Sequence, residues 1–291
     1  MVKIKQTIGF IGQGWIGKNY ADDFENRGYD VVRYALEEPY ANNRYKVRQC
    51  KIVFIAVPTP TTTEGFSAEF VIDALTNLSK GTIAVIKSTM QPGRTDRLQQ
   101  LFPDLYVLHS PEFLREKTAK YDVEHPERNI IGIPIDDYIF AEKARIVMEL
   151  LPRAKYEKVM SAKEAELVKY AGNCLLYSKV IFMNILYDLV IKSEADYSIV
   201  REALVADSRV GESHTDPVHN SGHDESEVKS KRGAGGHCFI KDFESFRRLY
   251  KEKVNNESAS ELLSAMVKYN NHLLLSTKKD VDLLEEVYGK V

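Results

Sequence analysis

The sequence contains few cysteines, has almost no net charge and lacks a long apolar run. Its 291 residues include three cysteines, which are too few and too scattered for a disulfide framework, so each is expected to be a thiol. The 40 Lys and Arg residues nearly balance the 42 Asp and Glu residues, and the formal charge is −2. This balance gives no electrostatic reason to expect nucleic acid or an anionic membrane as a partner. No uninterrupted apolar run approaches the roughly 18–20 residues of a membrane span.

A cleavable signal is also missing from the first residues, since MVKIKQTIGF passes directly into a structured pattern. We therefore expect a cytoplasmic protein. The composition is that of a globular chain, with 44% hydrophobic and 28% charged residues. A chain of this length can form two domains of about 100–200 residues each.

Short β-branched runs alternate with amphipathic stretches from residue 6 to about residue 154. The runs are TIGFIG, YDVVRYA, KIVFIAV, TIAVIKST, LYVLHS and NIIGIP. Strands separated by helical segments predict parallel βαβ units. The expected fold class is α/β, with a Rossmann-like doubly wound parallel sheet in a domain of residues 1–155.

The pattern changes after residue 155. Residues 161–191 contain no proline and one glycine, which predicts one long helix. The second part of this helix is apolar on more than one face, which indicates burial against its own domain and against another element or subunit. We expect a mostly helical dimerisation and catalytic domain over residues 156–291, and a homodimer.

A glycine fingerprint stands between the first predicted strand and the first predicted helix. Gly12, Gly14 and Gly17 have the spacing G-x-G-x-x-G. The first glycine of such a turn permits the tight bend, the second lets the backbone approach a pyrophosphate, and the third allows close helix–strand contact. The pattern predicts a dinucleotide site; a purely structural glycine turn is the alternative.

The second predicted strand lacks the acidic residue that usually binds the cofactor ribose, because Ala35 falls near that position. Glu37 or Glu38 could reach the ribose hydroxyls, or Arg33 could receive the 2′-phosphate of NADP. The two glutamates could equally be ordinary solvated charges. NAD is the expected cofactor.

Polar turns follow the third and fourth predicted strands, at the carboxyl edge where open α/β sheets bind ligands. The first of them contains Val57, Pro58 and Thr59, and the second contains Ser88 and Thr89. Their hydroxyl groups are expected to face the nicotinamide half of the cofactor. Helix capping by Ser88 or Thr89 is compatible with that role.

Charged and amide groups follow in two further places. Glu112 and Glu116, in the segment SPEFLRE, can position water or accept a proton, or can belong to a solvated salt-bridge network. On the predicted long helix, Lys169 and Asn173 are four residues apart and leave the same face. Two such donors suit a developing oxyanion; an ordinary exposed helix face is the alternative.

The strongest single candidate is the segment GAGGHCFIKD at residues 233–242. It places Cys238 at a predicted helix start, where the helix dipole favours a thiolate, and Asp242 one helical turn later. Cys238 is the predicted nucleophile, whereas Cys50 and Cys174 are expected to be inert.

The polar stretch at residues 212–232 is longer than most loops of compact domains, which predicts a functional or mobile segment. His214, His219, His223 and His237 lie in or beside it. No H-E-x-x-H or C-x-x-C spacing accompanies them, so we expect no metal site.

Together these motifs resemble those of the UDP-glucose/GDP-mannose dehydrogenase family. GFIGQGWIG, VPTP, STMQPG, SPEFLRE, AELVKYAGN, DSRVG and GAGGHCFIKD occur in the family's order and near its spacing, over residues 8–242. The resemblance implies that an NAD-dependent enzyme oxidises a nucleotide sugar at C6, with UDP-glucose and its product UDP-glucuronate as the expected pair. It also implies two hydride transfers, one water consumed and a place in polysaccharide biosynthesis.

The resemblance assigns roles to individual residues. Cys238 would form a thiohemiacetal and then a thioester, while Lys169 and Asn173 hold the oxyanion. Arg209 would approach the nucleotide, across a dimer interface or within one chain. The implied catalytic residues are Cys238, Lys169, Asn173, Asp242, Thr89, Glu116 and Glu112. The implied cofactor-binding residues are Gly12, Gly14, Trp15, Ile16, Gly17, Val57, Pro58, Thr59, Ser88, Thr89 and Glu116. The implied substrate-binding residues are Phe113, Leu114, Arg115, Lys169, Asn173, Arg209, Gly235 and Gly236.

The sequence also departs from the family's pattern. Family members usually continue for a hundred or more residues into a second Rossmann-like domain, whereas this sequence stops at Val291, so part of the nucleotide site is expected to be missing. Ala234 replaces a usual aromatic residue, and Ile240 replaces a usual proline. Two alternatives remain: a non-catalytic NAD-binding protein, and a two-electron β-hydroxyacid dehydrogenase, which needs no thiol.

Overall fold

The computed structural model describes residues 7–219 and 231–290. The chain divides into two compact units, one of Met1–Thr59 and Ser67–Lys169 and the other of Pro60–Phe66 and Tyr170–Val291. The division falls within the long helix α7 (Ala162–Lys192), later than the expected boundary at residues 155 and 156. The start of α7 belongs to the first unit because Glu166 accepts hydrogen bonds there from the backbone of Gly93 and Thr95.

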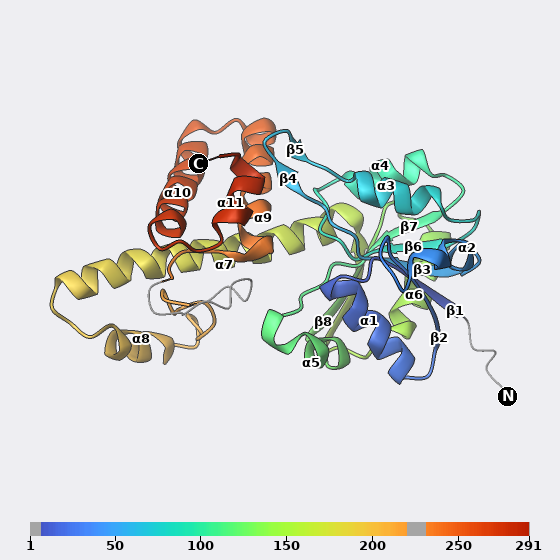
Figure 1. Cartoon of the computed structure of the whole chain (residues 1–291), viewed down its shortest axis with the longest axis horizontal. Coiled ribbons are helices and arrows are strands. Elements are labelled where there is room, and N and C mark those ends of the chain that lie inside the picture. The colour runs from blue at the N-terminus through green and yellow to red at the C-terminus, as the bar shows by residue number, and fades with distance from the viewer. Residues whose placement is uncertain (1–6, 220–230, 291) are drawn as a thin grey trace. The chain divides into compact units, whose positions relative to one another are not determined.

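A seven-stranded sheet forms the centre of the first unit (Figure 1). The strand order is β2-β1-β3-β6-β7-β8-β9. The strands are β1 (Thr7–Ile11), β2 (Asp30–Tyr34), β3 (Ile52–Ile55), β6 (Ile83–Ile86), β7 (Tyr106–His109), β8 (Arg128–Ile133) and β9 (Tyr156–Ser161). Neighbours from β2 to β7 are parallel, whereas β8 is antiparallel to β7 and parallel to β9. The predicted α/β, Rossmann-like class is confirmed, with a reversed edge of the sheet that strand–helix alternation did not predict.

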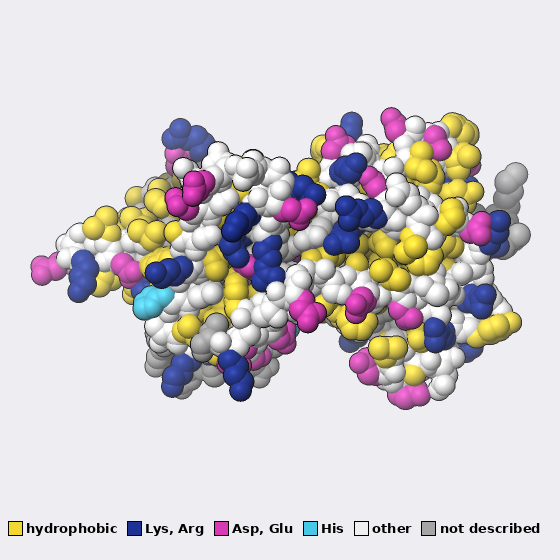
Figure 2. All heavy atoms as spheres, turned by 90° about the horizontal axis from the view of Figure 1, so that it is seen from above, with side chains coloured by type: hydrophobic (Ala, Val, Ile, Leu, Met, Phe, Trp, Pro, Cys, Tyr) yellow, Lys and Arg dark blue, Asp and Glu magenta, His cyan; other side chains and the backbone are white. Residues whose placement is uncertain are grey.

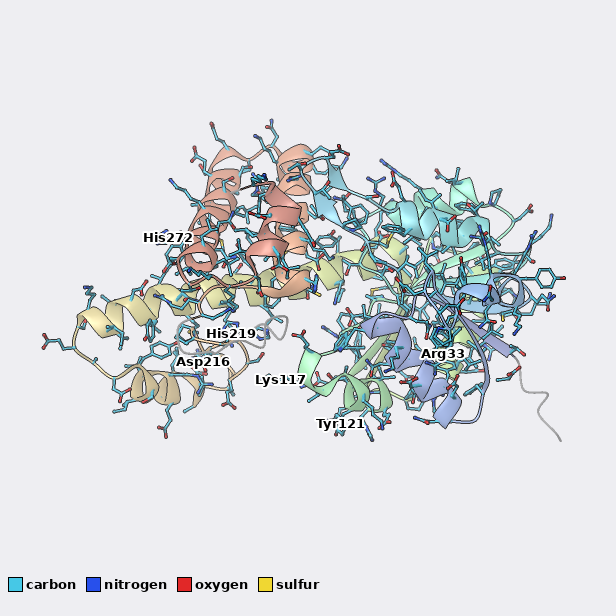
Figure 3. The ribbon with its side chains drawn as sticks, in the orientation of Figure 1. Arg33, Lys117, Tyr121, Asp216, His219 and His272 are labelled. Atoms are coloured by element: carbon cyan, nitrogen blue, oxygen red, sulfur yellow. The ribbon has the colours of Figure 1, made fainter. Side chains whose placement is uncertain are left out.

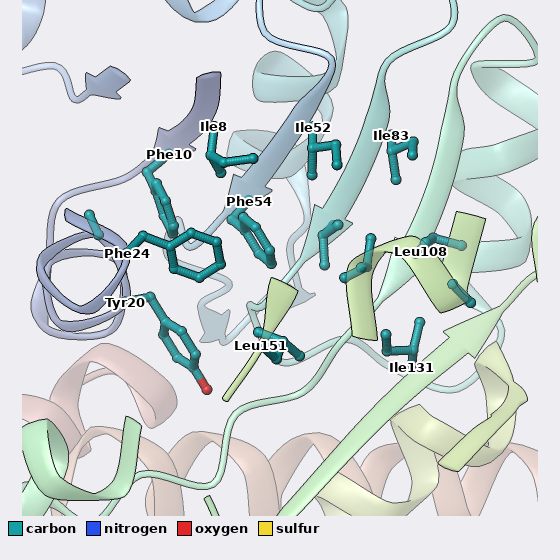
Figure 4. Close-up of a cluster of buried hydrophobic side chains, with 14 of the residues drawn as sticks. Ile8, Phe10, Tyr20, Phe24, Ile52, Phe54, Ile83, Leu108, Ile131 and Leu151 are labelled. Atoms are coloured by element: carbon teal, nitrogen blue, oxygen red, sulfur yellow. The ribbon is translucent and has the colours of Figure 1, made fainter. Parts of the chain in front are cut away.

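Helices cover both faces of this sheet, which explains why β3 and β6 are buried at every residue. Side chains of α1, α5 and α6 share a core with one face, and Figure 1 shows α3 and α4 on the other side. Phe10, Phe24 and Phe54 form the centre of that core, with ring centroids 5.1–5.3 Å apart (Figure 4). The helices of the unit, besides the start of α7, are α1 (Trp15–Asn26), η1 (Ala41–Asn43), α2 (Arg44–Val47), α3 (Glu69–Thr76), α4 (Arg94–Leu101), η2 (Glu116–Thr118), α5 (Ala119–Glu124) and α6 (Tyr138–Leu150).

The second unit is helical apart from a short hairpin. It contains the hairpin β4 (Thr61–Thr62) and β5 (Gly65–Phe66), most of α7, α8 (Tyr197–Val205), α9 (Gly236–Val254), α10 (Glu257–Ser276) and α11 (Val281–Tyr288). Its core includes Tyr177 stacked on Phe243, with ring centroids 3.9 Å apart. The long helix predicted at residues 161–191 is confirmed. The hairpin was not predicted, because two-residue strands leave no readable periodicity.

By length and composition alone, α7 is the one helix of the described ranges that could cross a membrane. Core helices of soluble proteins meet the same criterion, and α7 buries Tyr170, Tyr177 and Val180 in a hydrophobic cluster of the second unit. The criterion is therefore weak evidence for a span. Several apolar side chains of α7 are nevertheless exposed, among them Leu175, Phe182 and Leu189.

Candidate functional site

The glycine turn between β1 and α1 has the backbone geometry of a phosphate-binding loop. Gly12 has a φ of 88°, and a Cβ added there would lie 2.3 Å from the carbonyl oxygen of Ala56. A Cβ on Gly17 would lie 1.9 Å from the carbonyl oxygen of Gly12, so only glycine lets α1 pack this closely. At Gly14 an added Cβ would meet no described heavy atom within 4 Å. The three positions thus have the geometry that the fingerprint requires.

The N-terminus of α1 is open to an anion. Gly14 is the N-cap residue, no side chain caps the first turn, and that turn carries no acidic residue. A helix N-terminus presents unsatisfied N–H groups and a positive partial charge. These features fit the pyrophosphate of a dinucleotide.

Arg33, near the end of β2 (Figure 3), forms ion pairs with carboxylates of the first unit. Its side chain is 8% exposed and lies 2.7 Å from both Asp22 and Glu25. A guanidinium neutralised by two carboxylates is poorly suited to receive a 2′-phosphate, which favours NAD over NADP. Glu37 and Glu38 are exposed just after this strand.

The two predicted polar turns are hydrogen-bonded to each other at the carboxyl edge of the sheet. Thr59 Oγ1 donates to the carbonyl oxygen of Thr89 at 2.9 Å, and Ser88 Oγ donates to that of Val57 at 2.6 Å. The contact follows from the pairing of β3 with β6. The structure therefore brings four of the expected cofactor-binding residues together.

A buried ion pair joins Glu112 to Lys169. Lys169 Nζ lies 2.7 Å from Glu112 Oε1 and also donates to the backbone oxygen of Glu112 at 2.9 Å. The other carboxylate oxygen accepts the N–H of Leu114 at 2.8 Å. Burial raises the pKa of Glu112. The charge of Lys169 and the hydrogen bonds lower this pKa by more, so the net shift is downward. Glu112 is therefore an ionised, fully bonded partner for the Lys169 ammonium.

Lys87 is a second buried amine near this pair, and sequence reasoning missed it. It stands just after β6, where its Nζ lies 3.2 Å from Ser110 Oγ and 4.2 Å from the ring centroid of Tyr20. Burial lowers the pKa of Lys87 to about 7, and the charge of Lys169 adds to this effect while Glu112 opposes it. The sequence signal that could have identified this buried amine is a lysine that directly follows an apolar strand.

The rest of the segment SPEFLRE has mainly local partners. Arg115 forms an ion pair with Asp122 at 2.5 Å, although its side chain is 61% exposed. The guanidinium of Arg128 lies 3.7 Å from the ring centroid of Phe113. Glu116 lines a cavity of about 480 Å³ together with Trp15. Two residues expected at the cofactor thus share one cavity of the first unit.

In the second unit, Cys238 lies in the first turn of α9 with an exposed side chain. Cys50 and Cys174 are buried. Burial raises the pKa of the Cys50 thiol to about 11 and shifts that of Cys174 in the same direction. All three cysteines lie in the described ranges, and Cys238 is the only exposed thiol among them.

Asp242 is held by two donors. Asn173 Nδ2 donates to Asp242 Oδ2 at 2.6 Å, and Lys241 Nζ lies 2.5 Å from Asp242 Oδ1. The Asp242 side chain is 1% exposed. The structure thus brings Asn173 and Asp242 together, in one unit with Cys238.

Arg209 is the most exposed of the expected substrate residues, at 88%, and it pairs with Asp207 at 2.6 Å. His214 and His219 follow α8, and His237 lies on α9. His223 and residues 220–230 of the polar stretch lie outside the described residues. Among the residues that are described, no group of three or more His, Cys, Asp or Glu side chains is arranged to hold a metal ion.

The glycine turn, the open helix N-terminus and the polar sheet edge define the first unit as a dinucleotide-binding domain. Residues 35–147 match the NAD binding domain of the UDP-glucose/GDP-mannose dehydrogenase family, and residues 163–272 match its central domain. The chain belongs to this family, and the cofactor of its first unit is NAD.

Relatives of known name agree with this assignment. The chain is 31% identical over 257 residues to the UDP-glucose 6-dehydrogenase YwqF of Bacillus subtilis, covering 83% of this chain and 53% of that protein. It is 29% identical over 257 residues to the putative UDP-glucose 6-dehydrogenase YtcA of the same organism, covering 84% and 56%. The chain therefore spans about half the length of these curated relatives. Its structure is similar to that of a UDP-glucose dehydrogenase from Pyrobaculum islandicum, with a TM-score of 0.77, 26% identity, and 97% and 71% of the two chains covered.

Proposed function

We propose that this protein oxidises a nucleotide sugar at C6 with NAD, converting UDP-glucose to UDP-glucuronate by two hydride transfers. The observation that carries the proposal is the exposed Cys238 thiol in the first turn of α9, in a chain whose first unit binds NAD. A two-electron β-hydroxyacid dehydrogenase has no use for such a thiol.

The reaction needs a nucleophile between its two oxidations. NAD would supply the hydride acceptor for both oxidations. In the first, the carbon C6 loses a hydride and its hydroxyl group loses a proton to a base, which gives an aldehyde. The Cys238 thiolate then adds to the aldehyde carbon and forms a thiohemiacetal. A second hydride leaves to a second NAD, the resulting thioester is hydrolysed by water, and the carboxylate and the thiol are released. Each sugar thus consumes two NAD and one water and yields two NADH and three protons.

The chain's own residues bind and stabilise the reacting groups in this proposal. Lys169 and Asn173 donate to the oxygen that becomes negative at each addition step. Asp242, fixed by Asn173 and Lys241, orients the hydrolytic water together with Thr89 and Glu116. The sugar nucleotide is contacted by Phe113, Leu114, Arg115, Arg209, Gly235 and Gly236.

A substrate panel tests the proposal. UDP-glucose, GDP-mannose, UDP-N-acetylmannosamine and a small β-hydroxyacid are each supplied with NAD, and NADH formation is followed by absorbance. UDP-glucose is expected to be oxidised fastest and to yield an acid. Oxidation of the hydroxyacid alone contradicts the proposal, and so does NAD binding without reduction in any reaction.

The glycine turn gives a matched pair of variants. Gly14→Ala is expected to fold normally, because its Cβ enters open space, and to weaken NAD binding at least about tenfold, because the pyrophosphate approaches the backbone there. Gly17→Ala is expected to lower the melting temperature as well, since its Cβ would lie 1.9 Å from a carbonyl oxygen. Titration calorimetry with NAD and thermal unfolding separate the two effects. Equal loss of stability in both variants contradicts the assignment.

We further propose a homodimer formed through α7. Leu175, Phe182 and Leu189 recur every seven residues on α7 and are 58–71% exposed, with Ile185 between them at 52%. Hydrophobic side chains are visible at the end of the second unit formed by α7 and α8 (Figure 2). Such a stripe is typical of a helix–helix seam.

We also propose, together with the enzymatic function, a cytoplasmic location and a role in polysaccharide biosynthesis.

Phe182→Asp is expected to convert the dimer into a monomer, measured by sedimentation equilibrium, because a carboxylate replaces an apolar side chain of the seam. Leu101→Asp is the matched control, since Leu101 is 61% exposed but lies on α4, a different helix from the stripe. An unchanged mass for Phe182→Asp, or a monomeric parent protein, contradicts this part of the proposal.

A further inference from the structure

Two buried charged residues, Lys279 and Asp280, pack against the glycine-rich segment that precedes Cys238. Their side chains are 0% and 3% exposed. They lie just before α11 and beyond residues 163–272, the range that matches the family's central domain. None of the sequence motifs includes them.

Both residues bond to the backbone of the turn at residues 233–236. Lys279 Nζ donates to the carbonyl oxygen of Gly233 at 2.8 Å. Asp280 Oδ2 accepts the N–H of Gly236, the first residue of α9, at 2.7 Å. A Cβ on Gly235 would lie 2.0 Å from Asp280 Oδ2, so glycine is required there to admit the carboxylate. The two side chains therefore hold both ends of the turn.

The backbone around this pair is strained and well anchored. Lys278 and Asp280 have φ values of 52° and 48°, a region that residues other than glycine seldom adopt. The N–H of Lys279 donates to Leu274 at 2.9 Å, and the carbonyl oxygen of Asp280 accepts from Leu284 at 3.0 Å. Strained residues of this kind persist where the surrounding structure holds them, and they cluster at functional sites.

A histidine from the segment after α8 completes the surroundings of Lys279. Lys279 Nζ lies 3.2 Å from His219 Nε2, and His219 Nδ1 lies 2.9 Å from the carbonyl oxygen of Asp216 (Figure 3). Burial lowers the pKa of His219 to about 4, so the ring is neutral and Nε2 can accept a hydrogen bond from the Lys279 ammonium. Burial also lowers the pKa of Lys279 to about 8, and the Asp280 charge opposes this.

We propose that Lys279 and Asp280 are positioning residues that set the charge at the first turn of α9 and thereby the reactivity of the Cys238 thiol. Cys238 stands two residues after Gly236, whose N–H Asp280 holds. A carboxylate at that turn disfavours a thiolate, and an ammonium beneath it favours one. The two charges act in opposite directions. The inference rests on the proposed function in one respect, which is that Cys238 is the nucleophile.

Charge variants with opposite expected effects test this inference. The rate of Cys238 alkylation by iodoacetamide is measured against pH by peptide mass spectrometry, with no cofactor or sugar present. Asp280→Asn keeps a hydrogen-bond acceptor and removes the negative charge, so the thiol pKa is expected to fall by about one pH unit. Lys279→Met removes the positive charge, so the thiol pKa is expected to rise by a similar amount.

The controls separate charge from loosening of the turn. Lys279→Arg keeps the charge and is expected to leave the alkylation profile unchanged. Asp282→Asn makes the same charge change as Asp280→Asn at an exposed position of α11, and it too is expected to leave the profile unchanged. The other titratable groups of this region are the same in every variant: His214, Asp216, His219, Lys231, His237, Lys241, Asp242 and Lys278.

Opposite shifts in Asp280→Asn and Lys279→Met support the inference. Shifts of the thiol pKa in the same direction, or no shift in either variant, overturn it. A turn that has only become looser would change the pKa of Cys238 in the same direction in both variants. If Lys279→Met does not fold, Asp280→Asn decides alone, and a thiol pKa that does not fall overturns the inference. The alkylation measurement does not require the enzyme to turn over a substrate. A chain that shows these shifts but does not oxidise UDP-glucose would contradict the proposed function and not this inference.

Discussion

Replacing Cys238 with serine is expected to lower the rate of UDP-glucuronate formation at least about 10³-fold, as removal of a catalytic nucleophile does in other enzymes. A serine hydroxyl is almost entirely protonated at neutral pH and adds poorly to an aldehyde, so the thiohemiacetal does not form. The product acid is measured by chromatography after incubation with UDP-glucose and NAD. The variant should fold normally, because Cys238 is exposed and the change is nearly isosteric.

Cys50→Ala is the matched control for this experiment. Cys50 is buried and burial raises the pKa of its thiol to about 11, so its loss should leave the chemistry unchanged. NAD binding is expected to survive in both variants, since neither residue lies in the glycine turn. Full acid production by Cys238→Ser would show that another group captures the aldehyde.

Replacing Lys169 with methionine is expected to lower the free energy of unfolding of the first unit by about 3–5 kcal/mol, because it leaves the Glu112 carboxylate buried without its ammonium partner. The same change removes one oxyanion donor, so kcat should fall about 10²–10³-fold. Urea denaturation and steady-state kinetics measure the two effects separately.

The double variant Glu112→Gln with Lys169→Met isolates the ion pair. It should be more stable than Lys169→Met alone, since no charge remains buried, and it should be equally inactive. A double variant no more stable than the single one would show that the pair does not account for the loss. Recovered activity would contradict the role of Lys169.

The pH dependence of stability gives a further signature of the same pair. In the parent protein the pKa of Glu112 is below its usual value, so the pair's contribution to stability is complete above that usual value and is lost as the pH falls through the lowered pKa. In Lys169→Met burial raises the pKa of Glu112 instead. The variant is therefore expected to lose stability as the pH rises from about 4 to 8, opposite to the parent.

The sequence was sufficient to predict the features that depend on local pattern. Apolar runs and intervening amphipathic stretches predicted six strands, which are β1, β2, β3, β6, β7 and β8. The absence of proline predicted α7. The glycine spacing predicted a turn in which Gly12 and Gly17 have no room for a side chain. These features depend on residues close together in the sequence, so their periods and spacings are readable.

Features made by distant segments were not predicted. The reversed direction of β8 depends on how the chain returns to the sheet, which strand–helix alternation does not encode. The burial of Lys87 and Lys279 depends on partners such as Ser110 and Gly233, far away in the sequence. The resemblance implied that Gly235 binds substrate, whereas the structure gives a separate reason for glycine at this position, the close approach of Asp280.

The number of NADH molecules formed per UDP-glucose consumed distinguishes a four-electron oxidation from a two-electron one. With limiting UDP-glucose and excess NAD, two NADH are expected for every sugar, with UDP-glucuronate as the final product and no accumulated aldehyde. A ratio of one, with the aldehyde released or an unrelated hydroxyacid oxidised in its place, would contradict the proposed four-electron oxidation.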